Sequence, residues 1–287
     1  MAKGNLFLGT AARSVGDVVM YRREGSQVSR VRVRKVANPR TDAQSLQRAA
    51  FSPVAKFFSP LAVVLERAFE GVSKSKSYSE FLKVNIKKAR ENGWLLPKGT
   101  GFFPLPYQLT KGTLPVLNIG VQGSAFVIID IEGDAQSQLQ TIGDLSKKFA
   151  ALGYVKGDVI TFIIVAGDNS AITNKNYVPR TFQFELDEDS TATIADTMPG
   201  LELYYSDEMG YILNFQMEHG STYAASVIVA RFENNKWRRS TQSLLVSDAV
   251  MTTVTSADAK AAAISSYGDT AGDINPMVYL DGSEIND

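Results

Sequence analysis

Arginines at alternating positions near the start of the chain are the residues whose type and spacing best suit a chemical task. Arg30, Arg32 and Arg34 are separated by single valines. In an extended strand such side chains share one face, about 6.6–7 Å apart. That spacing is close to the spacing of successive phosphates along one nucleic-acid strand. The planar guanidinium group also pairs well with phosphate or carboxylate. The pattern therefore indicates anion binding rather than catalysis.

Two interpretations of this basic segment stay open. Charged side chains can simply protect the exposed edge of a sheet. Alternatively, the segment contacts nucleic acid or an acidic face of a neighbouring subunit, which would explain why arginine rather than lysine dominates. The residues expected to make that contact are Arg22, Arg23, Arg30, Arg32, Arg34, Lys35, Arg40 and Arg48.

A secondary basic cluster follows the turn Glu233-Asn234-Asn235 and consists of Lys236, Trp237, Arg238 and Arg239. A tryptophan beside arginines can stack on bases or grip a partner. It can equally fill a hydrophobic core while the arginines flank it. We favour the core position for Trp237.

Candidate catalytic and metal-binding groups are scarce. The chain has no cysteine and one histidine, His219, which lies in an expected turn. The acidic run Asp187-Glu188-Asp189 lacks the spaced ligands of a calcium loop. No phosphate-binding glycine loop or G-x-S-x-G motif is present. We expect no catalytic residue, metal or cofactor, and no enzyme. An unrecognised site acting on a glycan is a hypothesis without a reactive group to nominate.

The charges of the chain are divided between two regions of opposite sign. Residues 1–100 contain 19 Lys/Arg and 7 Asp/Glu, a balance of +12, whereas residues 101–287 contain 11 and 23, a balance of −12. The formal net charge of the whole chain is zero, which hides this asymmetry. A basic region of this kind suggests a polyanionic partner, or attraction between opposite regions of neighbouring copies.

The elements that must position the arginines are a β-hairpin and short helices. Two strand-like runs within Asp17–Val36 flank a turn at 23–26. Thr41-Asp42-Ala43-Gln44 has the form of a capping box, which predicts a helix that ends before Pro53. Further helical segments are expected over 54–58, 61–69 and 77–90, where apolar residues keep helical spacing.

From residue 101 the chain has the pattern of an antiparallel β-sandwich. Strand-like runs are expected over 116–121, 125–131, 158–165, 181–186, 201–205, 211–217, 223–232, 241–246 and 275–280, with helices over 142–152 and 256–265. The predicted fold class is α+β: an N-terminal β-hairpin plus short helices, an Ig-like or jelly-roll-like antiparallel sandwich, and a short C-terminal helix. The expected regions are 1–100, 101–250 and a C-terminal extension, 251–287.

No apolar run approaches the ~18–20 residues of a membrane-spanning helix. The first residues, MAKGNLFLG, lack the form of a signal peptide. We therefore expect a soluble chain, made inside a cell, with no membrane partner.

Several short motifs of the first half occur in a fixed order. They are Gly4–Gly9, Val15–Val19, Val28–Arg34 and Asn38–Gln44 followed by Gln47-Arg48. This series resembles a family of small uncharacterised proteins encoded by gut bacteria and their phages, which share a G-x-V-G-x-V-V hairpin and an N-P-[RK]-T-x-A-Q-x-x-Q-R helix start. Tyr21-Arg22 departs from the commoner pattern, in which a tryptophan occurs.

The resemblance implies a viral or mobile-element origin and no enzymatic activity. Together with the divided charge, it favours a virion structural protein, a coat or capsid-associated subunit that self-assembles, located in the virion and made in the host cytoplasm. Its partners would be copies of itself and nucleic acid. The alternative is a nucleic-acid-binding accessory protein of a phage or mobile element that is not part of a particle.

Overall fold

The computed structural model describes residues 13–15, 17–23, 26–32, 41–122, 125–131, 139–168, 176–206, 210–215 and 220–268. The chain forms two compact units, one comprising Met1–Arg40 with Thr270–Asp287 and the other Thr41–Asp269. The boundaries drawn from the sequence at residues 100 and 250 stay predictions. The strand expected over 275–280 lies outside the described residues.

The smaller unit contains a three-stranded antiparallel sheet, in the order β1 (Arg13–Val15), β2 (Val18–Arg23) and β3 (Ser26–Val31). Strands β2 and β3 form the hairpin that the sequence predicts, with Val19 opposite Arg30 and Tyr21 opposite Val28. The pairing ends at Val18 opposite Val31.

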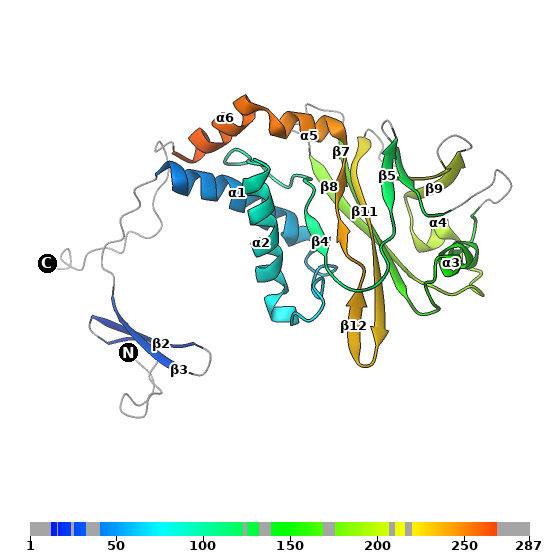
Figure 1. The fold of residues 1–287 in the computed structure, drawn as a ribbon, viewed down its shortest axis with the longest axis horizontal. Helices are drawn as coiled ribbons and strands as arrows, with labels where there is room; N and C mark the ends of the chain where they lie inside the picture. The colour runs from blue at the N-terminus through cyan, green and yellow to red at the C-terminus, as the bar shows by residue number, and fades with distance from the viewer. Residues whose placement is uncertain are drawn as a thin grey trace, which may run out of the picture. The chain divides into compact units, whose positions relative to one another are not determined.

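The larger unit contains two large antiparallel sheets and a two-stranded one (Figure 1). The first has the order β5 (Ile119–Gln122), β6 (Ala125–Ile128), β10 (Gly210–Phe215) and β9 (Leu201–Ser206). The second has the order β12 (Lys236–Arg239), β11 (Gly220–Glu233), β7 (Val159–Asp168) and β8 (Tyr177–Glu185), and β14 (Leu245–Val246) also pairs with β11. Strands β4 (Gln108–Thr110) and β13 (Gln242–Ser243) pair separately.

The helices described are α1 (Asp42–Phe58), the 3-10 turn η1 (Ser59–Leu61), α2 (Lys74–Glu91), α3 (Ile142–Ala151), α4 (Ile194–Thr197), α5 (Asp248–Thr255) and α6 (Ala257–Gly268). Helices α1, α2, α5 and α6 lie beside the second sheet on the side away from the first (Figure 1). The predicted α+β class, with an N-terminal hairpin and a C-terminal helix, is thereby confirmed.

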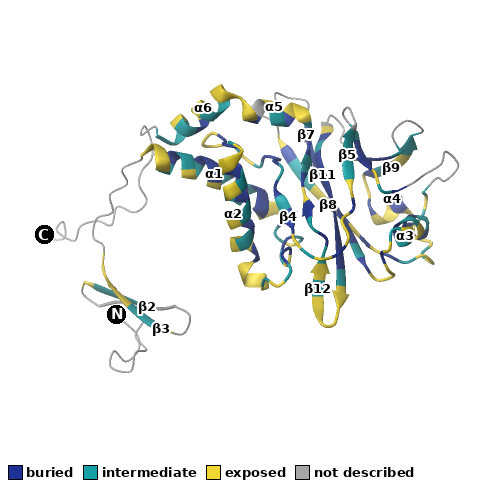
Figure 2. Ribbon diagram, viewed as in Figure 1, coloured by how far each residue is buried: buried dark blue, intermediate teal, exposed yellow. Residues whose placement is uncertain are grey.

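Strand β7 and the central part of β11, residues 224–230, are buried on both faces (Figure 2). Phe162 and Val227 belong to a core between the two sheets. Ile163 and Ile228, the next residue along each strand, belong to a second core shared with α1 and α2. Side chains alternate across a strand, so neighbouring residues serve different layers. The helices of the basic region and the large sheet therefore pack as one unit.

Helix α1 continues through Pro53, contrary to the prediction that it ends there. Proline lacks an N–H and leaves the carbonyl of the residue four positions earlier without its helical partner. Here that carbonyl belongs to Ala49 and accepts a hydrogen bond from the N–H of Leu96, at 3.4 Å. A hydrogen bond from a distant part of the chain therefore satisfies the group that proline would leave unpaired.

The prediction of a helix over 61–69 is also wrong. After η1 the chain forms successive turns, in which Leu65 N–H bonds to the Leu61 carbonyl and Ala68 N–H to the Leu65 carbonyl. Helix α2 then begins at Lys74, three residues earlier than the predicted start at Ser77. The hydroxyl of Ser77, inside the helix, donates to the Leu65 carbonyl at 2.7 Å and ties α2 to these turns.

Candidate anion-binding surfaces

The hairpin of the smaller unit presents two of the predicted arginines. Arg30 and Arg32 are exposed, and Arg30 has its guanidinium carbon 5.9 Å from the ring centroid of Tyr21. Tyr21 and Arg30 occupy the same face, because Tyr21 is opposite Val28, two residues from Arg30. Neither arginine forms an ion pair with a carboxylate among the described residues. This face therefore carries positive charge that the described part of the chain does not neutralise.

The other predicted contact residues have different positions. Arg22 and Arg23 lie in β2, opposite Gln27 and Ser26. Arg48 lies on α1 in the larger unit and is half-buried. Arg34, Lys35 and Arg40 lie outside the described residues.

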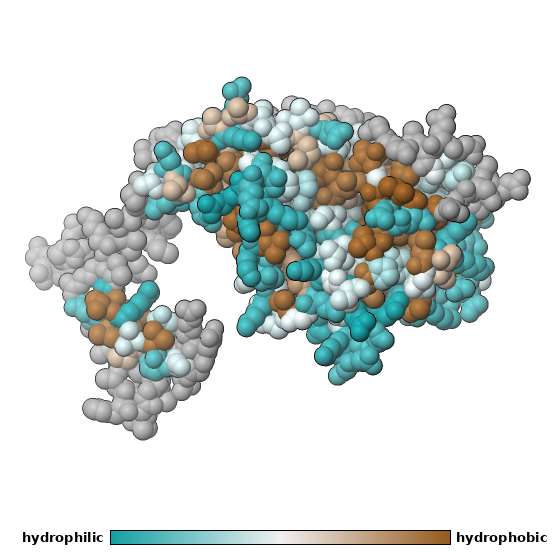
Figure 3. All heavy atoms as spheres, viewed as in Figure 1, coloured by the Kyte–Doolittle hydropathy of each residue, from teal (hydrophilic) through white to brown (hydrophobic). Residues whose placement is uncertain are grey.

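The secondary basic cluster forms β12 of a hairpin that extends past the neighbouring strand β7. The pairing of β7 with β11 ends at Val159 opposite Ala230, whereas β11 continues to Glu233. Asn234 and Asn235 form a two-residue turn with φ of 52° and 60°, as expected of asparagine in a tight hairpin. The projecting end of this hairpin is largely hydrophilic (Figure 3).

Trp237 lies on this hairpin and is half-buried, outside both cores. Its ring centroid is 5.2 Å from that of Phe232, and the guanidinium carbon of Arg239 is 5.5 Å from its centroid. The interpretation that Trp237 fills the sandwich core is therefore wrong. The physical reason is that β12 pairs with the end of β11, beyond most of the sheet-to-sheet packing.

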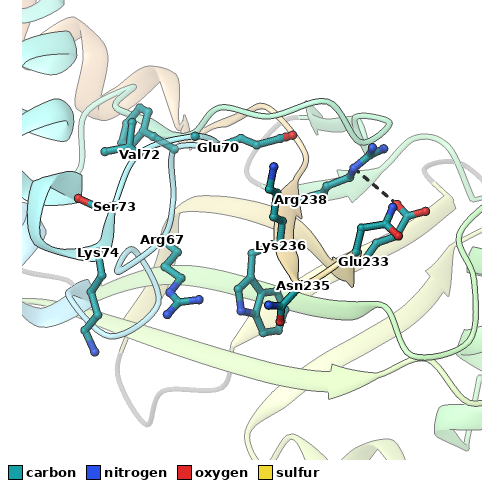
Figure 4. Close-up of a pocket in the computed structure, with 13 residues that line it drawn as sticks. Arg67, Glu70, Val72, Ser73, Lys74, Glu233, Asn235, Lys236 and Arg238 are labelled. Atoms are coloured by element: carbon teal, nitrogen blue, oxygen red, sulfur yellow. Dashed lines mark ion pairs between the residues drawn. The ribbon is translucent and has the colours of Figure 1, made fainter.

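A groove of about 740 Å³ separates this hairpin from the turns that precede α2. It is lined by Arg67, Phe69, Glu70, Gly71, Val72, Ser73 and Lys74 on one side and by Glu233, Asn234, Asn235, Lys236, Trp237 and Arg238 on the other. Figure 4 shows Arg67 extending from its turn to a position between Lys74 and Asn235. The sequence offered no signal for Arg67, because its segment was expected to be an ordinary helix.

Positive charge in and beside the groove is only partly balanced. Arg238 Nε lies 3.5 Å from Glu233 Oε2, the ion pair drawn in Figure 4. Burial, and to a lesser degree the neighbouring Arg67 charge, lower the pKa of Arg239 below its usual range. The Nε of Arg239 is buried and has no hydrogen-bond partner in the described part of the chain. Neither Arg67 nor Arg239 forms an ion pair with an acid of the described residues.

Two carboxylates of the acidic run Asp187-Glu188-Asp189, in the turn after β8, form ion pairs with a lysine. Lys156 Nζ lies 2.7 Å from Asp187 Oδ1 and 3.3 Å from Asp189 Oδ2. Across the residues that the structure describes, no three His, Asp or Glu side chains are grouped so as to hold a metal ion. His219 lies outside these residues.

None of the described helices is both long enough and apolar enough to cross a membrane. The model of a family of unknown function (DUF6266) matches residues 9–91, less than a third of the chain. This stretch contains β1 to β3, α1 and α2. No curated protein and no solved structure matches the chain.

Proposed function

We propose that this protein is a non-enzymatic structural subunit of a virion, a coat or capsid-associated protein that assembles with copies of itself. The observation that carries the proposal is the exposed pair Arg30 and Arg32, for which the described residues provide no carboxylate. Uncompensated arginine on a strand suits phosphates, or the acidic surface of another subunit. In the proposal this face meets nucleic acid or a neighbouring copy.

The larger unit would form the body of the particle. Its two large sheets and helical layer enclose two buried hydrophobic cores. The acidic balance of residues 101–287 complements the basic first hundred residues. Opposite charges on different regions of identical subunits steer association. The protein would be made in the host cytoplasm and reside in the virion.

Light scattering and negative-stain electron microscopy of the purified chain, with and without nucleic acid, test this proposal. We expect regular assemblies larger than a dimer, and we expect R30A/R32A to assemble at a higher protein concentration or lower salt than the unaltered chain. R90A, which removes an exposed arginine from α2, serves as the control for loss of positive charge. A chain that stays monomeric at high concentration, with or without DNA or RNA, would contradict the proposal.

A second candidate function is a nucleic-acid-binding accessory protein outside any particle. The observation that favours it is that the arginine-bearing hairpin belongs to a compact unit of its own. This candidate predicts tight, salt-sensitive nucleic-acid binding by a chain that forms no regular assembly. The scattering experiment therefore separates the two functions.

A further inference from the structure

The groove between the β11–β12 hairpin and the turns before α2 is lined by more cations than acids. The Glu70 carboxylate accepts from the N–H of Thr113 at 2.9 Å and from its hydroxyl at 3.1 and 3.2 Å. Glu233 faces Arg238. Within the described residues, Arg67 and Lys236 have neither an ion pair nor a side-chain hydrogen bond. With Lys74 paired to Glu66 and Arg238 to Glu233, the charges of Arg67 and Lys236 are set against the single charge of Glu70, so the net charge left in the groove is positive.

Arg239 adds to this imbalance from a position beside Trp237. Its side chain is half-buried, and its guanidinium carbon lies 5.5 Å from the centroid of the Trp237 ring, which lines the groove. Arg239 does not line the groove itself, so it would act indirectly, by adding positive charge beside the site.

The groove also offers aromatic surface next to the cations. Trp237 lines the groove, and Phe232, its neighbour across the hairpin, is 55% exposed. Exposed aromatic side chains beside arginines are the usual platform for unpaired bases, because every base has a flat face that can stack. A simple inorganic anion or an acidic peptide would make no such use of the rings.

We propose that this groove binds a phosphate-bearing nucleoside unit, with Arg67 contacting the phosphate and Trp237 stacking against the base. The unit can come from a free nucleotide or from single-stranded nucleic acid. This site lies entirely within the larger unit, so it does not depend on the proposed role of the N-terminal hairpin or on assembly into a particle.

The test measures binding by a chain that carries R30A/R32A, so that the N-terminal β2–β3 hairpin contributes little to the measured affinity. The probes are inorganic phosphate, dTMP, fluorescein-labelled dT12 and a poly-glutamate peptide of similar charge. Tryptophan fluorescence reports on Trp237, since the other tryptophan, Trp94, is only 8% exposed and gives a constant background. The site variants are R67A and W237A.

Arg90 provides the matched control variant, R90A. It is exposed on the same unit and lies near the far end of α2, about 24 Å along the helix from Lys74 at 1.5 Å per residue. A urea unfolding curve for each variant establishes that it folds. We expect R67A and W237A to weaken dT12 binding at least about fivefold, and R90A to leave it nearly unchanged.

The outcomes separate the sources of the ligand. Stronger binding of dT12 than of dTMP identifies a nucleic-acid strand, whereas equal affinity per site identifies a nucleotide. Weaker binding of labelled dT12 by W237A, followed through the fluorescein anisotropy and with the variant still folded, supports the stacking position. The proposal is overturned if neither dTMP nor dT12 binds, if R90A weakens binding as much as R67A, or if phosphate or poly-glutamate binds as tightly as dT12.

Discussion

The carboxylate of Asp158 and the guanidinium group of Arg231 form a bidentate pair at the end of the large sheet. Arg231 Nε donates to Asp158 Oδ1 and Nη2 donates to Oδ2, each at 2.7 Å. Asp158 is completely buried, whereas the Arg231 side chain keeps 23% of its surface exposed. These hydrogen bonds raise the pKa of Arg231. The pair joins β11 to the start of β7 at the point where the projecting β11–β12 hairpin begins.

Replacing Asp158 by alanine should destabilise the larger unit substantially. The change leaves the Arg231 charge without its partner and also removes the acceptor for the N–H of Val155, which lies 2.9 Å from Oδ2. Breaking a buried ion pair by removing one member costs about 3–5 kcal/mol, and we expect the lower end because Arg231 is partly solvated. Urea unfolding measures the change in stability. K156A breaks an exposed pair instead, and an equal destabilisation in that variant would contradict the account.

Asn85 should help to hold α2 against β4. Its side-chain amide donates to the carbonyls of Phe81 and Gln108, both at 3.0 Å, and its oxygen accepts from the N–H of Gln108 at 2.7 Å. N85A removes the partners of the backbone N–H and carbonyl of Gln108, a half-buried residue, at a cost of about 1–3 kcal/mol. The control is N92A, because Asn92 is exposed and its side chain bonds only to the end of its own helix. Similar unfolding midpoints for the two variants would argue against this role.

The N-terminus of α3 should show a defined dependence on pH. Thr141 donates to Asp144 Oδ2 through its hydroxyl, at 2.7 Å, and its backbone N–H, at 3.2 Å. These hydrogen bonds lower the pKa of Asp144. A carboxyl group whose pKa is lower when folded adds stability above its ordinary pKa of about 3.9, and this stability disappears as the pH falls through the folded pKa.

Replacing Thr141 by alanine removes both the cap and the hydroxyl that lowers the Asp144 pKa. We expect a destabilisation of about 1 kcal/mol near neutral pH and an upward shift of the Asp144 pKa in an NMR titration. The destabilisation should shrink as the solution is acidified below the folded pKa. T193A, which removes the corresponding cap of the short α4, should leave the Asp144 titration unchanged. An unaltered titration in T141A would show that the cap does not set this pKa.

Local patterns predict the elements of this fold better than their endings or their packing. Hairpin β2–β3 and the start of α1 at Thr41 follow from alternation, turn residues and a capping-box sequence, all of which are local. The course of α1 through Pro53 depends on Leu96, more than forty residues away, and no local rule anticipates it. For the same reason Arg67 and Trp237 reach one groove through tertiary packing that their sequence neighbours do not reveal.

The salt dependence of nucleic-acid binding tests the central claim, that Arg30 and Arg32 meet negative charge outside their own fold. The affinity of the unaltered chain and of R30A/R32A for a labelled single strand is measured between about 50 and 200 mM salt, a range over which phosphate binding weakens strongly. The account predicts that the double variant binds more weakly and that its log–log slope is shallower by about 0.7 for each phosphate that it no longer neutralises. Equal affinities and equal slopes for the two proteins would contradict it.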